Sequence, residues 1–127
     1  MGIKSQYAVA VVNTLNGDSE VTVAAGATTS STLGCGGTSP TGIFLPSTFI
    51  SCNITFNVSK NPNGPFVPVT NFDGSSFTVA GAASEFIPLL PAMFNSVLFI
   101  QLSFSVAQTS AEVIDFALSP LFQGVHG

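Results

Sequence analysis

One stretch of the chain alternates strictly between apolar and polar residues. Residues 52–59 read CNITFNVS, a period of two that is typical of a β-strand with one buried face. The apolar positions are Cys52, Ile54, Phe56 and Val58, and the polar positions are Asn53, Thr55, Asn57 and Ser59. Residues 61–65 contain two prolines and a glycine, which break a strand and turn the chain. We therefore predict a β-hairpin with arms over residues 52–60 and 66–70.

Further short strands are predicted on both sides of this hairpin. They cover residues 6–14, 20–25, 29–33, 41–46, 76–80, 85–89, 98–106 and 112–119, and Pro91 opens a single helical turn over residues 91–94. The side chains predicted to face the core from the second strand and the last two strands are Val21, Val23, Ala25, Leu98, Ile100, Leu102, Phe104, Val106, Ile114, Phe116 and Leu118. The pattern predicts an all-β fold, a single antiparallel β-sandwich of jelly-roll-like or barrel-like form over residues 1–127.

Charge changes this picture, because only 6% of the residues are charged, against a typical value of about 25%. Two lysines, no arginine and six acids cannot give the mixed charged surface of a freely soluble monomer. The sequence therefore favours a subunit that packs in an assembly. A monomeric β domain covered by serine and threonine is the alternative. Nucleic acid is excluded as a partner, since phosphate contact needs clustered Lys or Arg.

The two ends of the chain carry apolar residues that a small core does not absorb. Residues 6–14 are apolar on both faces of the predicted strand, which suits a contact between subunits. We expect an N-terminal arm over residues 1–14 and a C-terminal tail over residues 120–127. The predicted partner contacts at these ends are Tyr7, Val9, Val11, Val12, Leu121 and Phe122.

Catalytic and metal chemistry finds little support among the ionisable residues. The single histidine, His126, is the penultimate residue, and a hydrolase needs an imidazole held in place. Zinc needs three or four ligands, which two separated cysteines and this histidine do not supply. Calcium could use Asp18 with Glu20, or Asp73 with nearby Asn71, but neither pair matches the EF-hand spacing. We expect no enzyme activity and no cofactor.

The remaining acids and the cysteines have structural interpretations. Glu112 and Asp115 fall near the start of a strand and are predicted to face solvent, without forming a paired-carboxylate site. Cys35 and Cys52 are predicted to be small hydrophobic residues, with a disulfide as the alternative. Apolar runs such as residues 97–100 are far too short to span a membrane. Residues 7–12 are too short for a secretory signal, so synthesis in a cytoplasm is expected.

Several segments in a fixed order resemble small β-rich structural proteins of tailed bacteriophages. The segments are TGIFLPSTF (41–49), ITFNVS (54–59), FVPV (66–69), DGSSFTV (73–79) and LPAMFNSVLFI (90–100). The resemblance spans roughly residues 20 to 119. The chain departs from the family pattern at Met93, where relatives carry an acid, and it lacks their arginine before the late strand.

The resemblance implies a virion structural protein made in the bacterial host cytoplasm. A short single domain without fibre repeats best suits a capsid decoration (cement) protein on the outer capsid surface. Its expected partners are the major capsid protein and copies of itself, as a homotrimer. A head–tail or tail accessory protein is the alternative, and a carbohydrate-binding β-sandwich is a third, which the absence of tryptophan disfavours.

Overall fold

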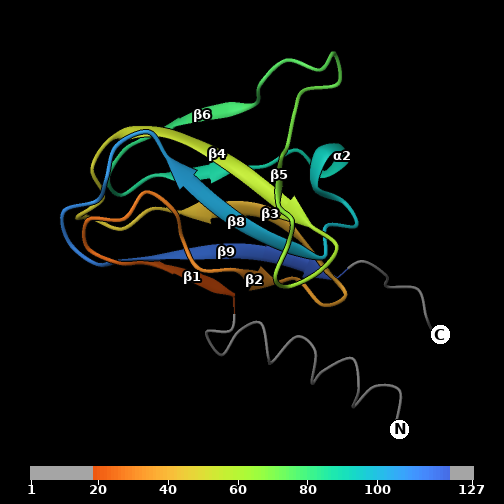
Figure 1. Cartoon of the computed structure of the whole chain (residues 1–127), viewed down its shortest axis with the longest axis horizontal. Coiled ribbons are helices and arrows are strands. Elements are labelled where there is room, and N and C mark those ends of the chain that lie inside the picture. Colours follow the sequence, from red (N-terminus) through yellow and green to blue (C-terminus); the bar gives the residue numbers. More distant parts are fainter. Residues whose placement is uncertain (1–18, 121–127) are drawn as a thin grey trace, which may run out of the picture.

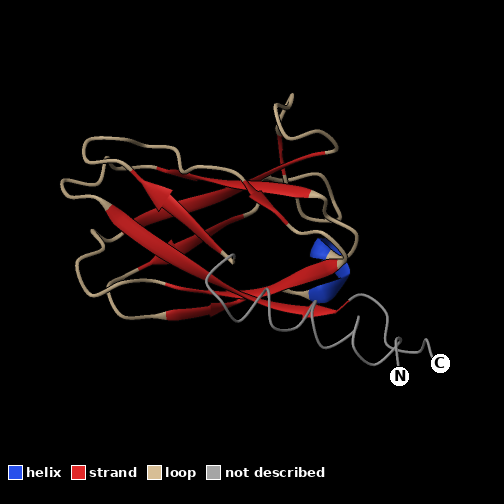
Figure 2. Cartoon of the chain, turned by 90° about the horizontal axis from the view of Figure 1, so that it is seen from below, coloured by secondary structure: helices blue, strands red, loops and turns tan. Residues whose placement is uncertain are grey.

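The chain folds as two antiparallel β-sheets packed face to face, in a computed structural model that describes residues 19–120 (Figures 1 and 2). The first sheet, called the β9 sheet, has the order β1 (Glu20–Val23), β9 (Glu112–Pro120), β3 (Thr38–Phe44) and β7 (Phe86–Pro88). The second, the β4 sheet, has the order β2 (Leu33–Gly34), β8 (Phe99–Phe104), β4 (Cys52–Ser59) and β5 (Val67–Pro68), and β6 (Thr78–Gly81) also pairs with β4. The predicted all-β sandwich is confirmed.

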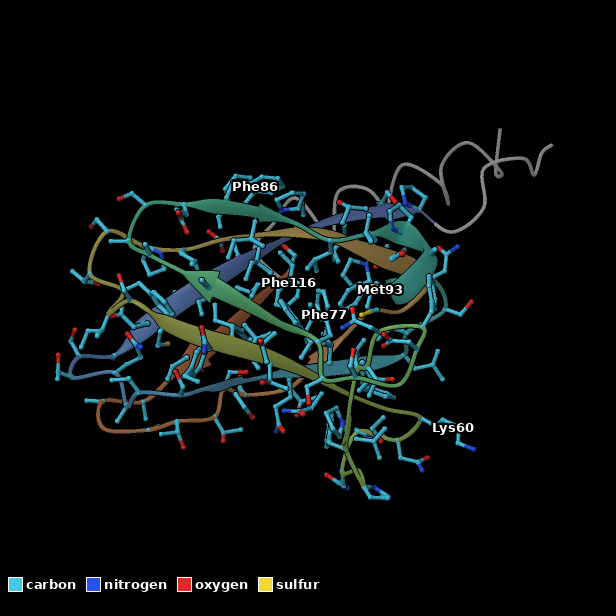
Figure 3. All side chains as sticks on the ribbon, turned by 90° about the horizontal axis from the view of Figure 1, so that it is seen from above. Lys60, Phe77, Phe86, Met93 and Phe116 are labelled. Atoms are coloured by element: carbon cyan, nitrogen blue, oxygen red, sulfur yellow. The ribbon has the colours of Figure 1, made fainter. Side chains whose placement is uncertain are left out.

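The alternation in β4 produces the buried layer that the sequence predicts. Ile54 and Phe56 are fully buried, while the polar positions of the strand lie on its outer face. Strand β8 pairs with β4 and adds buried Ile100 and Leu102 to the same layer. Across the sandwich, Ile43, Ile114 and Phe116 of the β9 sheet face them; Figure 3 shows Phe116 pointing into the space between the sheets.

A single helical turn, α2 (Pro91–Phe94), closes one end of the sandwich between the layers (Figure 2). It forms where predicted, with Pro91 in its first turn. Phe94 is fully buried, and its ring contacts Phe56 at 5.4 Å and Phe77 at 6.0 Å between ring centroids, both in edge-to-face geometry. This aromatic cluster fixes the helical turn to the core.

Several predicted strand bounds and orientations are wrong. The strand predicted over residues 29–33 is instead the two-residue β2, and Thr29 makes only an isolated bridge to Ser103. Ala25 is exposed because β1 ends at Val23. Leu98 and Val106 are also exposed, and the rest of the predicted inward set is buried or packs against the core. Leu98 and Val106 lie outside the bounds of β8, where the chain leaves the packed layer.

Consecutive strands β8 and β9 lie in different sheets, and Gln108 anchors the crossover between them. Its side chain is fully buried and forms two hydrogen bonds with one residue: Ile50 N donates to Oε1 at 2.8 Å, and Nε2 donates to Ile50 O at 3.2 Å. Its backbone oxygen accepts from Gly26 N at 2.6 Å, and its nitrogen donates to Ala27 O at 3.2 Å. Gln108 therefore ties three loops together at one end of the sandwich.

Glu112 does not face solvent, which corrects the prediction for this residue. Its side chain is only 2% exposed, because it sits opposite Val23 on the inward face of the sheet. The carboxylate accepts hydrogen bonds from Thr48 Oγ1 at 2.6 Å and Ser110 Oγ at 3.2 Å. Asp115, three residues later, lies on the opposite face and is exposed, as predicted.

Both cysteines are free, as predicted. Cys35 is buried, and burial raises the pKa of its thiol to about 11. Cys52 is half-buried at the start of β4 and packs against the core.

Candidate protein-binding face

The outer surface of the β9 sheet carries two exposed phenylalanines in contact, Phe44 and Phe86. Four residues stand side by side in one row across its four strands, in the order Glu20, Asp115, Phe44 and Phe86. With neighbouring strands about 4.8 Å apart, this row is about 14 Å wide. Val113 and Pro88 are exposed on the same side of the sheet. We call this surface the aromatic face and define it by Glu20, Phe44, Phe86, Pro88, Val113 and Asp115.

Phe44 and Phe86 form a side-chain pair at the surface. Their ring centroids are 4.6 Å apart with an interplanar angle of 47°, and the residues are 50% and 46% exposed. Figure 3 shows Phe86 on the outer side of β7, away from the core. Gly42 makes room for the ring, since a Cβ at that position would lie 2.2 Å from Phe86 Cζ. Because both strands belong to the sheet, the backbone positions of the pair are fixed before any partner arrives.

Covering this pair would release apolar surface from water. Burying a whole phenylalanine side chain contributes about 1.5–3 kcal/mol, so covering the exposed half of each ring contributes about 1 kcal/mol. Val113, which is 45% exposed, adds to the same surface. Phenylalanine is among the aromatic residues that are enriched in protein–protein interfaces. The aromatic face is therefore suited to binding another protein.

The charge on this face has a single sign. Glu20 and Asp115 are both exposed within the row that holds the aromatic pair. Among residues 19–120 the only lysine or arginine is Lys60, which follows β4 in the other sheet. Figure 3 shows Lys60 at the far side of the molecule from Phe86. The aromatic face is consequently both apolar and negative.

The outer surface of the β4 sheet has a different character. Polar residues of β4 stand beside Gln101 and Ser103 of β8 and Thr78 of β6. Asn57 Nδ2 donates to Ser103 Oγ at 2.8 Å across the two strands. We call this uncharged surface the polar face. It includes Asn53, Thr55, Asn57 and Ser59, the residues that the sequence predicts on the polar side of β4.

A shallow apolar groove lies where the β4–β5 turn meets the segment before β8. It has a volume of about 510 Å³ and is lined mainly by Val58, Val67, Val97 and Leu98, with Lys60 beside them. Val67 and Leu98 are both about half exposed. The groove could accept one apolar side chain of a partner, but it holds few polar groups that would orient a small ligand.

The partner contacts predicted at the chain ends lie outside the described residues. They are Tyr7, Val9, Val11, Val12, Leu121 and Phe122, and they stay predictions. Sequence reasoning missed Phe44 and Phe86, because each lies in a short apolar run where alternation does not separate the two faces. Once the structure places their neighbours Ile43 and Ile87 in the core, Phe44 and Phe86 must lie on the outer face, because adjacent strand residues point to opposite faces.

The acids and cysteines of residues 19–120 form no group of three or more that could hold a metal ion. Within the same range, no helix has the length and apolar character needed to cross a membrane. In comparisons with known proteins, no family model, no curated protein and no solved structure matches the chain.

Proposed function

We propose that this protein is a structural protein of a bacteriophage virion, specifically a capsid decoration protein that binds the outer shell and bridges neighbouring capsid subunits. The observation that carries the proposal is the aromatic face: two half-exposed phenylalanines in contact on the outer surface of a sheet. A chain with 6% charged residues and such a face is suited to burial against other proteins. The segments within residues 41–100 that resemble structural proteins of tailed bacteriophages support a role in the virion.

The proposed mechanism is binding without turnover. A decoration protein that contacts two capsid subunits at once adds buried area across their junction, and separating the subunits then requires exposing that area again. Residues fixed in strands lose little conformational freedom on binding, so more of the buried area contributes to affinity. The pair of Phe44 and Phe86 meets this condition, because β3 and β7 pair directly at these two residues.

Self-association belongs to the same proposal and uses the chain ends. Tyr7, Val9, Val11 and Val12 in the arm, with Leu121 and Phe122 in the tail, are proposed to contact neighbouring copies in a homotrimer or to extend the contact with the major capsid protein. The aromatic face would remain available for the shell. Removing residues 1–12 and measuring oligomer size by light scattering tests this part separately.

Co-sedimentation with capsids tests the main proposal. Shells assembled from the major capsid protein of the same phage, without this protein, are mixed with the wild type and with a Phe44→Ala, Phe86→Ala variant. A Thr55→Ala, Thr78→Ala variant of the polar face is the matched control. We expect the wild type and the control to sediment with the shells and the aromatic variant to stay in solution. Wild-type protein that binds purified tails and not shells would favour the tail accessory alternative.

The polar face gives the carbohydrate-binding alternative one specific observation. Its amide and hydroxyl groups, among them Asn57, Gln101 and Ser103, can pair with sugar hydroxyls. Saturable binding on a glycan array, removed by Asn57→Ala with Gln101→Ala and retained in Phe44→Ala, would replace the capsid proposal. Protein that binds shells and no glycan would exclude this alternative.

A further inference from the structure

We infer that the aromatic face docks on a different protein whose contact surface places arginine or lysine side chains around an apolar site, and that a second copy of this chain does not cover it. The identity of that protein as the capsid subunit rests on the proposed function. The chemistry of the contact rests on the face itself, where Asp115 lies beside Phe44 in register and Glu20 is next in the row.

The position of the carboxylates makes the partner's charge a requirement. Asp115 occupies the strand next to Phe44, about 4.8 Å away in the sheet, so a partner that covers the aromatic rings also covers this side chain. A carboxylate removed from water without a compensating group weakens binding strongly. Phe44 and Asp115 therefore favour a partner that supplies cations at the same place.

Arginine matches this surface better than lysine. A guanidinium group can donate two hydrogen bonds to one carboxylate while its flat face stacks on a neighbouring aromatic ring. The register of Asp115 beside Phe44, with Phe86 on the other side of that ring, presents both kinds of acceptor in one row. An arginine over Asp115 and an apolar side chain over the pair would complete the contact.

Within residues 19–120, a second copy of the chain offers few of the groups that this contact needs. The sequence contains no arginine, and Lys60, the lysine of these residues, lies away from the aromatic face on the other sheet. Two aromatic faces packed together would remove four carboxylates from water, Glu20 and Asp115 of each copy, with no lysine or arginine of residues 19–120 on either face to pair with them. Like charges in a desolvated contact are repulsive, so symmetric pairing through this face is disfavoured.

Docking through the aromatic face also fixes how the domain is oriented on its partner. The aromatic face and the polar face are the outer surfaces of the two opposed sheets. When the β9 sheet lies against the partner, the uncharged polar face with Asn57 and Thr55 points away from it. Such a surface is well hydrated and offers further proteins few apolar or charged contacts.

Binding to shells at low and high salt tests the charge requirement. The Glu20→Gln, Asp115→Asn variant keeps the side-chain shapes and removes both charges; Asp115→Asn alone is compared with Asp73→Asn, in the turn between β5 and β6, which removes one charge outside the aromatic face. We expect wild-type affinity to fall as salt rises, and the neutral variant to bind about tenfold more weakly at low salt with most of the salt dependence lost. Equal or tighter binding by the neutral variant would overturn the inference, even with the proposed function intact.

A synthetic peptide separates the inference from the proposed function. A peptide of alternating leucine and arginine is titrated into the labelled protein, and a matched peptide of leucine and glutamate is the control. We expect the arginine peptide alone to shift the NMR signals of Phe44, Phe86 and Asp115. This result would support the inference even if the protein bound no shell, whereas no shift with either peptide would overturn it.

Light scattering tests the exclusion of a second copy. We expect the Phe44→Ala, Phe86→Ala variant to have the same oligomeric state as the wild type at every protein concentration. A wild-type oligomer that dissociates in this variant would show that another copy covers the aromatic face, and the inference would be wrong.

Discussion

The ring of Phe86 fills the space that a side chain at residue 42 would occupy. A Cβ built on Gly42 would lie 2.2 Å from Phe86 Cζ and 2.5 Å from Cε1, and 3.1 Å from the backbone oxygen of Ile87. The two residues are diagonal neighbours on β3 and β7, and the glycine lets the ring lie against the sheet. Gly42 therefore helps to orient the aromatic pair without touching a partner itself.

Gly42→Ala is expected to displace the Phe86 ring and keep the fold. The closest atoms belong to the tip of a side chain that faces solvent, so the ring can rotate away. The loss of stability should be about 1 kcal/mol, the lower end of the range for added methyl groups. Shell binding should fall as far as in Phe86→Ala. Urea unfolding and co-sedimentation measure the two effects, and unchanged binding would show that the ring position is irrelevant.

Gly81→Ala provides the contrasting variant, because it adds the same methyl group to the core. The new Cβ would lie 2.8 Å from both Ile54 Cδ1 and Leu45 Cδ1. Both residues are buried: Ile54 belongs to β4, and Leu45 directly follows β3. We expect a loss of about 1–3 kcal/mol in unfolding free energy, with shell binding of the folded protein retained. A stability equal to the wild type would mean that the core at this point can expand freely.

The position of a strand can be predicted from local sequence, whereas the strands with which it pairs cannot. Alternation over residues 52–59 predicts β4 and its buried face, since period two is a local property. The pairing of Ile54 with Phe104 joins residues fifty positions apart, and nothing local records it. Consecutive β8 and β9 consequently resemble a hairpin in the sequence and lie in different sheets.

The candidate site was less predictable than the fold, for a related reason. Residues 42–45 read GIFL, and an apolar run does not say which of Ile43 and Phe44 is buried. Only the pairing with β7 and β9 assigns Ile43 to the core and Phe44 to the surface. Glu112 is an acid that is buried, and the hydroxyl that donates to its carboxylate belongs to Thr48, which is distant in the sequence.

Gln108→Ala is expected to destabilise the protein by about 1–3 kcal/mol. The change removes both side-chain hydrogen bonds to Ile50. The backbone N–H and C=O of Ile50 then lose the amide of Gln108 as their partner in a part-buried site. Gln101→Ala, on the outer polar face, is the matched control and should cost less than about 0.5 kcal/mol. Thermal and urea unfolding measure both. Equal effects of the two changes would contradict a structural role for the buried amide.

Cys35 is expected to resist thiol reagents while the protein is folded. Burial raises the pKa of its thiol from 9.0 to about 11, so at pH 8 its reactive thiolate is about a hundredfold scarcer than in an ordinary cysteine. A Cys52→Ser variant isolates this thiol for labelling with a chromogenic disulfide. Labelling should be slow in buffer, should accelerate as the pH rises, and should be fast in denaturant. Rapid labelling of the folded variant at pH 8 would refute the prediction.

The carboxyl of Asp73, in the turn after β5, should titrate at an unusually acidic pH. Ser75 donates to Asp73 Oδ1 from its hydroxyl at 2.6 Å and from its backbone nitrogen at 2.9 Å. These bonds, the hydroxyl first, lower the pKa of the Asp73 carboxyl below its ordinary value of 3.8. The charged form is thus favoured in the folded turn, and this contribution is present above the ordinary pKa and lost as the pH falls through the lowered one.

The amide signal of Ser75 reports this titration directly by NMR. Its midpoint should lie below 3.8 in the wild type. In Ser75→Ala the hydroxyl donor is gone while the backbone bond remains, so the midpoint should move up toward the ordinary value. Asp73→Asn should abolish the transition, which assigns it to this carboxyl. An identical midpoint in the wild type and in Ser75→Ala would show that the hydroxyl does not stabilise the carboxylate, and the turn would then be held by its backbone bonds alone.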